Sequence, residues 1–377
     1  MKKILFLQIK GRSYAGVWNV NKLVGEELIK RGYIVHIVSI RNNQNDILLE
    51  YDKRLIVKTI NEKDVWETYH IEDMIKELKK VHIFKVFKMG IERISHDIKL
   101  KEDVKKLHQY IYEYKPDYII TSHYQLLDMI PKDYLSKTIH EQHTSLKIAL
   151  SIRDNKKTFD KYKDKIKFLW LCEKAKDKAI EYGYKNSTYI YNAVRIKSDE
   201  RAKVIENKKL VTIARLSDEK RIDLMIEIVE NIFKDSKYKD WVFLIYGDGN
   251  KKEFLQSKIK NTKQIKLMGV TDNPKEVLLS SAINLNTSPS EGFSLSILEA
   301  YECGVPTIAF NFGESTEEQI IDGKTGIIAK DREDYQEKLK YLMDNLNELD
   351  KMSKNAKEYV KKFTVDNVIS KWIELLK

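Results

Sequence analysis

The sequence predicts an α/β protein with two facing Rossmann-like, doubly wound domains and a cleft between them. Its 377 residues exceed what one hydrophobic core usually organises, so two domains of ordinary size are expected. In each half, short apolar strands alternate with helix-length segments, and glycine-containing loops follow several strands. The expected limits are residues 1–192 for the first domain, 193–364 for the second, and 365–377 for a terminal helix that would pack back on the first.

The first domain opens with a β-α-β pattern. Residues 3–9 form an apolar strand, residues 17–31 have a helical pattern that Gly32 ends, and residues 33–40 resume an apolar strand. Such a crossover implies parallel strands. Further strands are expected at residues 118–122, 138–141, 167–172 and 187–191.

The second domain repeats this alternation. It starts with a strand at residues 210–214, a helix at 219–233 and a strand at 241–246. Three more strands, each separated by a helix-length segment, are expected at residues 265–268, 282–287 and 306–310. The pattern predicts a second doubly wound sheet, with ligands bound at the carboxyl ends of its strands.

Composition narrows the class of protein. Hydrophobic residues at 42% and charged residues at 33% describe a globular chain. No run approaches the roughly 20 apolar residues of a spanning helix, and the run from Ile4 to Leu7 is too short for a signal peptide. Cys172 and Cys303 form no C-x-x-C pair, which suits a reducing compartment and gives no hint of zinc. We expect a cytoplasmic protein, either free or peripheral at the inner face of the cell membrane.

The net charge of +11 indicates a polyanionic partner, which is nucleic acid, an anionic membrane surface or an acidic polymer. The absence of zinc-finger spacing, RNP-like motifs and basic heptad arrays disfavours nucleic acid. An AT-rich genome enriches Lys, Asn, Ile and Tyr together, so a merely solvated surface also explains the charge.

Residues 289–300 form the most informative segment, because they join an apolar strand to a helix. The backbone N–H groups of Phe293, Ser294 and Leu295 are the expected unpaired donors at the helix start, where they would hold a diphosphate. Gly292 would let that ligand approach closely.

Two carboxylates in this segment suggest how the rest of a nucleotide sugar is held. Glu291 precedes the helix and Glu299 lies inside it, roughly 12 Å further along at 1.5 Å per residue. One would accept hydrogen bonds from sugar hydroxyls and the other from ribose hydroxyls. The alternative is that Glu291 is a helix-start acid and Glu299 an exposed helix residue.

The segment resembles family 4 of the glycosyltransferases, of the GT-B superfamily. That family carries two glutamates with seven residues between them and then a Gly-Val-Pro strand start, as do Glu291, Glu299 and residues 304–306 here. The resemblance covers residues 211–326 well and the N-terminal domain in outline. It implies a GT-B fold, a nucleotide-sugar donor with UDP as the usual nucleotide, and a place in teichoic-acid, capsule or other envelope polysaccharide synthesis.

The same resemblance assigns cations to the donor diphosphate. Arg215 and Lys220 follow a strand directly and match the Arg and Lys with which the family meets the diphosphate. Fixed cations stabilise the charge that grows on a departing nucleoside diphosphate. The alternative is a helix start flanked by ordinary surface cations. No Asp-x-Asp pair is present, so we expect no divalent metal and no cofactor.

A histidine in the N-terminal domain near the sugar is a further feature of similar enzymes. His140 and His143 both fit, and the Thr-Ser that follows favours His143, while His123 is a weaker candidate. A loop histidine without such a role remains the alternative.

Similar enzymes also place glycine-rich loops around the donor. Gly16 matches the second glycine of a Gly-Gly turn over the diphosphate, although Ala15 replaces the first. Gly247, and the backbone near Met268 and Val270, follow strands of the second domain and would surround the nucleotide.

The resemblance implies transfer with retention by front-face attack, in which the leaving phosphate takes the acceptor proton. Glu291 and Glu299 are also too far apart for the roughly 5 Å carboxylate pair of a retaining hydrolase.

The basic segments suggest the acceptor. Residues 76–106 carry ten Lys or Arg against five acids, interleaved with apolar residues, and residues 147–178 form a second basic stretch. They would face anionic lipid, a lipid-linked glycan or a teichoic-acid-like chain. An amphipathic helix packed into its own domain explains the same pattern.

The sequence as a whole predicts a retaining hexosyltransferase. It would move a hexose or N-acetylhexosamine from a UDP-sugar to an envelope glycan, teichoic acid or lipid-linked acceptor. Three alternatives stay open: a GT-B-type sugar-nucleotide epimerase, a non-catalytic partner subunit of a glycosyltransferase complex, and a transferase acting on serine-rich protein.

Overall fold

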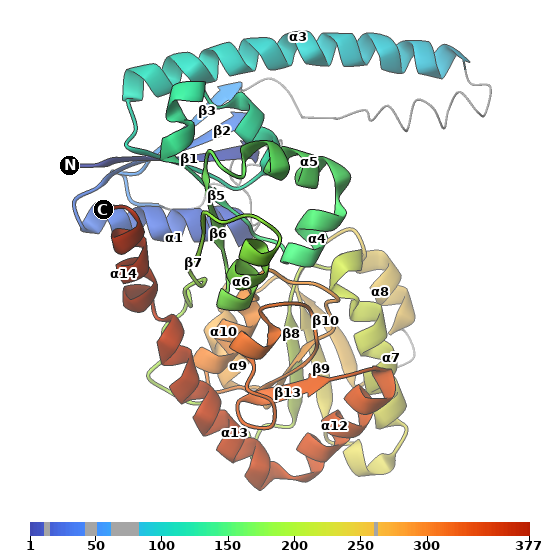
Figure 1. The fold of residues 1–377 in the computed structure, drawn as a ribbon. Helices are drawn as coiled ribbons and strands as arrows, with labels where there is room; N and C mark the ends of the chain where they lie inside the picture. The colour runs from blue at the N-terminus through green and yellow to red at the C-terminus, as the bar shows by residue number, and fades with distance from the viewer. Residues whose placement is uncertain (11–15, 42–50, 62–82, 260–262) are drawn as a thin grey trace. The chain divides into compact units, whose positions relative to one another are not determined.

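The computed structural model describes residues 1–377 except 11–15, 42–50, 62–82 and 260–262, and gives residues 83–98 as backbone only. The chain forms two compact units (Figure 1). The first comprises Met1–Glu141 and Asp154–Phe168, and the second Gln142–Arg153 and Leu169–Lys377. The limits 1–192, 193–364 and 365–377, the cleft and the docking of the terminal helix stay predictions.

The first sheet has seven strands in the order β3-β2-β1-β4-β5-β6-β7. Their bounds are β1 Lys3–Lys10, β2 Ile34–Arg41, β3 Ile56–Asn61, β4 Tyr118–Thr121, β5 Thr138–Glu141, β6 Lys167–Trp170 and β7 Ser187–Tyr189. Strand β1 pairs in parallel with β2 and with β4, so that Leu5 lies opposite both His36 and Ile119. The predicted doubly wound parallel sheet is confirmed, with its reversal of strand order at β1.

Two helices cover opposite faces of the first unit's strands (Figure 1). Helix α3, Ile83–Tyr114, places Leu107 and Ile111 in one core with Leu5 and Leu7 of β1. Helix α1, Gly16–Lys30, packs on the other face through Gly25, where an added Cβ would lie 3.2 Å from Leu55 and 3.3 Å from Val35. Two 3-10 helices and a short helix complete this part: η1 Tyr124–Met129, η2 Lys132–Lys137 and α5 Arg153–Tyr162.

The second sheet has six strands in the order β10-β9-β8-β11-β12-β13. They span β8 Lys209–Ile213, β9 Val242–Tyr246, β10 Ile265–Gly269, β11 Ile283–Asn286, β12 Thr307–Phe310 and β13 Gly326–Ala329. All printed pairings are parallel. Because the chain moves outward from β8 in one direction and then from β11 in the other, the topological switch point lies between β8 and β11.

Helices α7, α8, α9, α10, α12 and α13 contribute side chains to the core of this sheet. The helices of the second unit are α4 Leu146–Ser151, α6 Glu173–Glu181, η3 Asp218–Lys220, α7 Ile222–Phe233, η4 Ser236–Tyr238, α8 Lys252–Lys258, α9 Pro274–Leu279, α10 Leu295–Glu302, α11 Thr316–Gln319, α12 Arg332–Asp344, α13 Leu346–Tyr359, η5 Val360–Phe363 and α14 Val365–Leu375. Ile226 of α7, Ile245 of β9 and Ile283 of β11 are fully buried together. No helix in the described part of the chain has the length and apolar character needed to cross a membrane.

One predicted helix differs from the structure. The segment 219–233 is broken, because Arg221 adopts a left-handed backbone with φ of 48° between η3 and α7. The break turns the Lys220 side chain out of the helix register, and this local geometry matters for the site described next.

Candidate active site

Lys220 and Glu291 meet at the switch point of the second sheet. Lys220 ends η3, in the connection after β8, and Glu291 lies in the loop between β11 and α10. The Lys220 Nζ lies 2.5 Å from Oε1 of Glu291, with both side chains mostly buried, at 23% and 15% exposure. The two residues were singled out on separate sequence motifs, and the fold brings them into direct contact.

The loop after β11 also fixes the backbone beside Lys220. The Thr287 hydroxyl lies 3.0 Å from the Lys220 carbonyl and 2.9 Å from the Arg221 carbonyl. Thr287 is fully buried, so this contact ties the two switch-point loops together. The left-handed turn at Arg221 is thereby held in place, and Lys220 with it.

Arg215 lies in the same connection but is solvent-exposed. Its guanidinium is 3.7 Å from Glu219, and 62% of its side chain is accessible. An exposed pair at that distance contributes little to stability. Arg215 therefore keeps its charge available at the carboxyl edge of β8.

Gly247 serves the packing of these loops. Its φ is 141°, and an added Cβ would collide with the Ala214 carbonyl. The Leu216 N–H donates to the Asp248 carbonyl at 2.9 Å, and the Gly247 N–H donates to the Gly269 carbonyl at 2.8 Å. Backbone hydrogen bonds therefore connect the loops that follow β8, β9 and β10. Gly247 is thus required by the backbone of the neighbouring loop, which the sequence did not indicate.

Met268 and Val270 stand at the carboxyl end of β10. Their side chains are 45% and 63% exposed. The apolar surface that they present beside these connected loops is where the sequence placed the nucleotide. That assignment stays a prediction.

His143 contacts the glutamate loop through its backbone. An added Cβ at Gly292 would collide with the His143 carbonyl, and the Ser145 Oγ lies 2.8 Å from the Ser290 Oγ. Gly292 has a structural requirement, because the chain at residues 143–144 lies directly against it. Its expected role in letting a ligand approach stays a prediction. His143 and Glu291 are therefore neighbours within the second unit.

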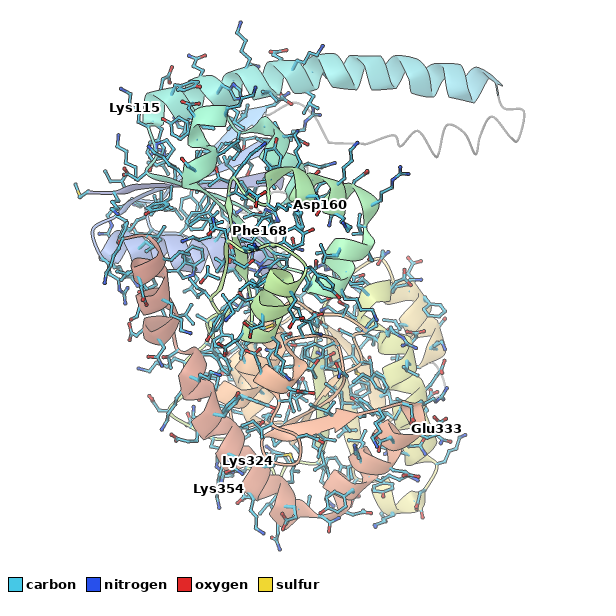
Figure 2. The ribbon with its side chains drawn as sticks, viewed as in Figure 1. Lys115, Asp160, Phe168, Lys324, Glu333 and Lys354 are labelled. Carbon is cyan, nitrogen blue, oxygen red and sulfur yellow. The ribbon has the colours of Figure 1, made fainter. Side chains whose placement is uncertain are left out.

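His140 and His123 have other surroundings. His140 is fully buried in β5, with Nδ1 2.9 Å from the Thr121 Oγ1 and its ring against Phe159 and Phe168. Phe168 is labelled in Figure 2. His123 caps η1 by accepting from the Gln125 N–H at 3.4 Å, and burial lowers its pKa to about 4. Of the three histidines, His143 is the one beside the glutamate loop.

The backbone at the start of α10 differs in one respect from the prediction. The Ser294 N–H already donates to the Gln319 Oε1 at 2.8 Å, so it is not an open donor. Ser294 makes no side-chain bond to the first-turn amides of α10. The N–H groups of Phe293 and Leu295 thus remain the expected donors to a ligand. The N–H of Ser294, which was expected to be a third open donor, is instead bonded to Gln319.

Glu299 is buried and paired, which argues against an exposed helix residue. Its side chain is 6% exposed, and its Oε1 accepts from Arg195 Nε at 2.8 Å and from a terminal guanidinium nitrogen at 2.5 Å. Arg195, at 33% exposure, was missed because a lone arginine in a charged connector carries no motif. The ribose role of Glu299 stays a prediction.

Gly16 is the first residue of α1 in the first unit. An added Cβ there would meet no atom of the described residues within 4 Å, so no contact within that part of the chain requires the glycine. The preceding loop, including Ala15, lies outside the described residues.

The basic segments are described only in part. Residues 76–82 and the side chains of 83–98 lie outside the description, whereas Lys101 and Lys105 of α3 are exposed. The stretch 147–178 is divided among three helices, and Lys161 within it pairs with Asp128 at 2.5 Å.

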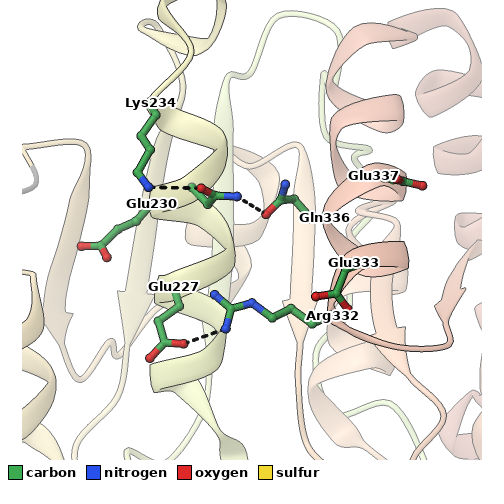
Figure 3. A pocket seen from close by; sticks show the side chains of 8 residues that line it. Glu227, Glu230, Lys234, Arg332, Glu333, Gln336 and Glu337 are labelled. Atoms are coloured by element: carbon green, nitrogen blue, oxygen red, sulfur yellow. Dashed lines mark hydrogen bonds and ion pairs between the residues drawn. The ribbon is translucent and has the colours of Figure 1, made fainter.

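A separate hollow of about 570 Å³ lies between α7 and α12 (Figure 3). Its rim is largely acidic, and Arg332 crosses it to Glu227 at 3.2 Å. None of the expected site residues lines it. Within the described residues, no cluster of three His, Cys, Asp or Glu side chains is arranged to hold a metal.

Two parallel, doubly wound α/β sheets, the second with a cation and a carboxylate at its switch point, define a GT-B fold. Crystal structures with this fold match the whole chain. TarM of S. aureus with Fondaparinux, alpha-GlcNAc-glycerol and UDP has a TM-score of 0.76 at 16% identity, covering 100% of both chains. Anabaena HepE with UDP-glucose has a TM-score of 0.75 at 16% identity, covering 100% and 99%.

Residues 194–359 match the family Glycosyl transferases group 1. Over 203 residues the chain is 29% identical to the Poly(ribitol-phosphate) alpha-N-acetylglucosaminyltransferase of Staphylococcus aureus (strain COL), covering 52% of this chain and 40% of that protein. It is 23% identical over 378 residues to the Poly(glycerol-phosphate) alpha-glucosyltransferase of Bacillus subtilis (strain 168), covering 90% and 56%. The chain thus spans about half the length of these curated relatives.

Proposed function

We propose that this chain is a retaining, metal-independent glycosyltransferase that uses a UDP-sugar. The observation that carries the proposal is the Lys220–Glu291 pair at the switch point of the second sheet, beside the start of α10. A cation and a carboxylate in contact at such a point offer partners for the two halves of a sugar phosphate. The relatives named for transfer to polyol phosphates support it.

In the proposed reaction, Lys220 and Arg215 face the diphosphate while Glu291 turns to the sugar hydroxyls. The bond between the anomeric carbon and the phosphate oxygen breaks, and a bond from the acceptor oxygen to the same carbon forms on the same face. The acceptor proton passes to the departing phosphate oxygen. The two cations stabilise the negative charge that remains on the nucleoside diphosphate.

His143 would contact the transferred sugar, and Glu299 would accept hydrogen bonds from the ribose. The supporting observations are that Gly292 brings the His143 backbone against the Glu291 loop and that Glu299 is held by Arg195. Met268 and Val270 supply exposed apolar surface for the base.

The acceptor that we propose is a polyol phosphate chain of the teichoic-acid type or a lipid-linked glycan, approached at an anionic membrane surface. The net charge of +11 and the exposed lysines of α3 support this choice. Flotation with anionic and neutral vesicles tests it: salt-sensitive binding to anionic vesicles alone is expected, and binding indifferent to lipid charge would contradict it.

The test of the function itself is thermal stabilisation by a panel of nucleotides and UDP-sugars in the presence of EDTA. A ligand that binds only the folded state stabilises it by about 2.7 kcal/mol at 100 times its Kd, which raises Tm. We expect UDP and one UDP-sugar to raise Tm under EDTA. No shift with any nucleotide would point to a non-catalytic subunit, and release of an altered free sugar without an acceptor would point to an epimerase.

A further inference from the structure

Gln319 holds the backbone of Ser294 at both of its polar groups. Its Oε1 accepts from the Ser294 N–H at 2.8 Å, and its Nε2 donates to the Ser294 carbonyl at 2.9 Å. Gln319 ends α11 and is fully buried. Its side-chain amide therefore bonds to the backbone just before α10 and is not exposed to solvent.

Asn192 holds the neighbouring end of the same peptide unit. Its Nδ2 donates to the Phe293 carbonyl at 3.1 Å, and its side chain is buried in the connection after β7. The Phe293 carbonyl and the Ser294 N–H belong to one planar group and point in opposite directions. Asn192 and Gln319 thus hydrogen-bond to the two opposite polar edges of one peptide group, the one that joins Phe293 to Ser294.

These hydrogen bonds also determine how the next peptide group, between Ser294 and Leu295, is oriented. Because Gln319 takes the Ser294 carbonyl, the N–H of Leu295 in that peptide unit points away from Gln319. The Phe293 ring is held separately, with its centroid 5.2 Å from that of Tyr191 and 5.4 Å from that of Phe363. The direction of the Leu295 N–H is therefore fixed by the bond to the Ser294 carbonyl, and the Phe293 residue beside it is held by its own ring and carbonyl.

The presence of asparagine at position 192 is not explained by stability alone. The Asn192 Oδ1 is buried and has no hydrogen-bond partner among the residues that the structure describes. A buried polar atom without a partner costs free energy, and an apolar side chain would avoid that cost. We therefore interpret Asn192 as needed for the hydrogen bond that its Nδ2 donates to the Phe293 carbonyl.

We propose that Asn192 and Gln319 are positioning residues that hold residues 293–294 and thereby aim the amide of Leu295 at the diphosphate of the donor. The inference rests on the proposed function and deepens it, because it names what orients that backbone donor. Preorganised donors aimed at developing charge are effective because they need no rearrangement during the reaction.

The test compares Gln319→Met and Asn192→Leu with Asn284→Val as a matched control. Asn284 is also buried in the second unit, where its Nδ2 donates to the Thr307 Oγ1 at 3.0 Å between β11 and β12, away from α10. UDP affinity, donor KM, kcat and Tm are measured for each. We expect Gln319→Met and Asn192→Leu to lose about tenfold or more in kcat/KM and UDP affinity, whereas Asn284→Val lowers Tm only.

Gln319→Glu keeps the test decisive if the methionine variant does not fold. It retains an acceptor for the Ser294 N–H but loses the donor to the Ser294 carbonyl, so an intermediate UDP affinity is expected. Wild-type affinity and kcat/KM in folded Gln319→Glu and Asn192→Leu would overturn the proposal. Failure of the wild-type protein to bind UDP would instead overturn the proposed function.

Discussion

Lys220 and Glu291 pair with each other at a distance of 2.5 Å. On the proposed function, a donor separates them by offering phosphate oxygens to the lysine and hydroxyl groups to the carboxylate. Each residue is therefore already placed at the atom it would serve. On the proposed function, Glu291 acts on the sugar, whose shape changes during transfer.

Glu291→Ala should lower kcat about 100-fold or more, because hydrogen bonds to the reacting sugar strengthen in the transition state. UDP affinity should change little, since the carboxylate faces the sugar. Initial-rate kinetics and calorimetric titration with UDP check the two parts. Full activity in this variant would show that the carboxylate has no part in transfer.

Glu299→Ala should weaken UDP binding about tenfold while kcat at saturating donor changes less. The carboxylate is buried against Arg195, so Arg195→Ala is the matched control that keeps the carboxylate. If Arg195→Ala loses as much affinity as Glu299→Ala, the pair acts as one unit. Unchanged UDP affinity in Glu299→Ala would remove the ribose assignment.

At the scale of elements, the site depends on loops that touch through their backbones. Gly292 lies against residues 143–144, and Gly247 against Ala214. In both places the neighbouring atom is main chain, which cannot swing aside as a long side chain can. These contacts fix the distance between the loops that carry Glu291, His143 and Arg215.

Gly292→Ala should therefore destabilise the second unit by about 1–3 kcal/mol, the usual cost of forcing atoms into a packed region. Gly323→Ala is a matched control, because Gly323 has φ of 71° but open space around its missing Cβ. Its cost should be about 1–2 kcal/mol, from backbone strain alone. Denaturant unfolding measures both, and a silent Gly292→Ala would mean that residues 143–144 can retreat.

The strands of both sheets were predictable because buried parallel strands are continuous apolar runs. Strands β3 and β13 were missed, since Ile56–Asn61 has only three apolar residues, which do not form one continuous run, and Gly326–Ala329 spans only four residues. The pair Lys220 and Glu291 followed from motifs, whereas Gln319 did not. A buried glutamine beside Glu317 and Glu318 reads as solvated surface, because only its tertiary partners reveal its role.

At the scale of the whole molecule, acid should weaken the fold through two histidines of the first unit. Burial lowers the pKa of His36 and of His123 to about 4. Between that value and the ordinary pKa near 6.5 the unfolded chain binds more protons than the folded one, so stability falls as pH drops from about 6.5 to 4.

Thermal unfolding across pH 4–8 measures this loss. His123→Asn retains a side chain able to cap η1 and cannot titrate, so its acid limb should be flatter than that of the wild-type protein. An identical acid limb in the two proteins would show that His123 does not contribute.

The mutual neutralisation of Lys220 and Glu291 has a consequence for selectivity among ligands. An empty site built from cations alone would attract any small anion, including free phosphate, which cells hold in excess. Here the lysine charge is already countered, and a bare phosphate that displaced Glu291 would leave a mostly buried carboxylate without a partner. On the proposed function, a sugar nucleotide brings both an anionic group and sugar hydroxyls and so replaces both partners at once, whereas UDP replaces only the partner of Lys220 and should therefore bind less tightly than the intact donor.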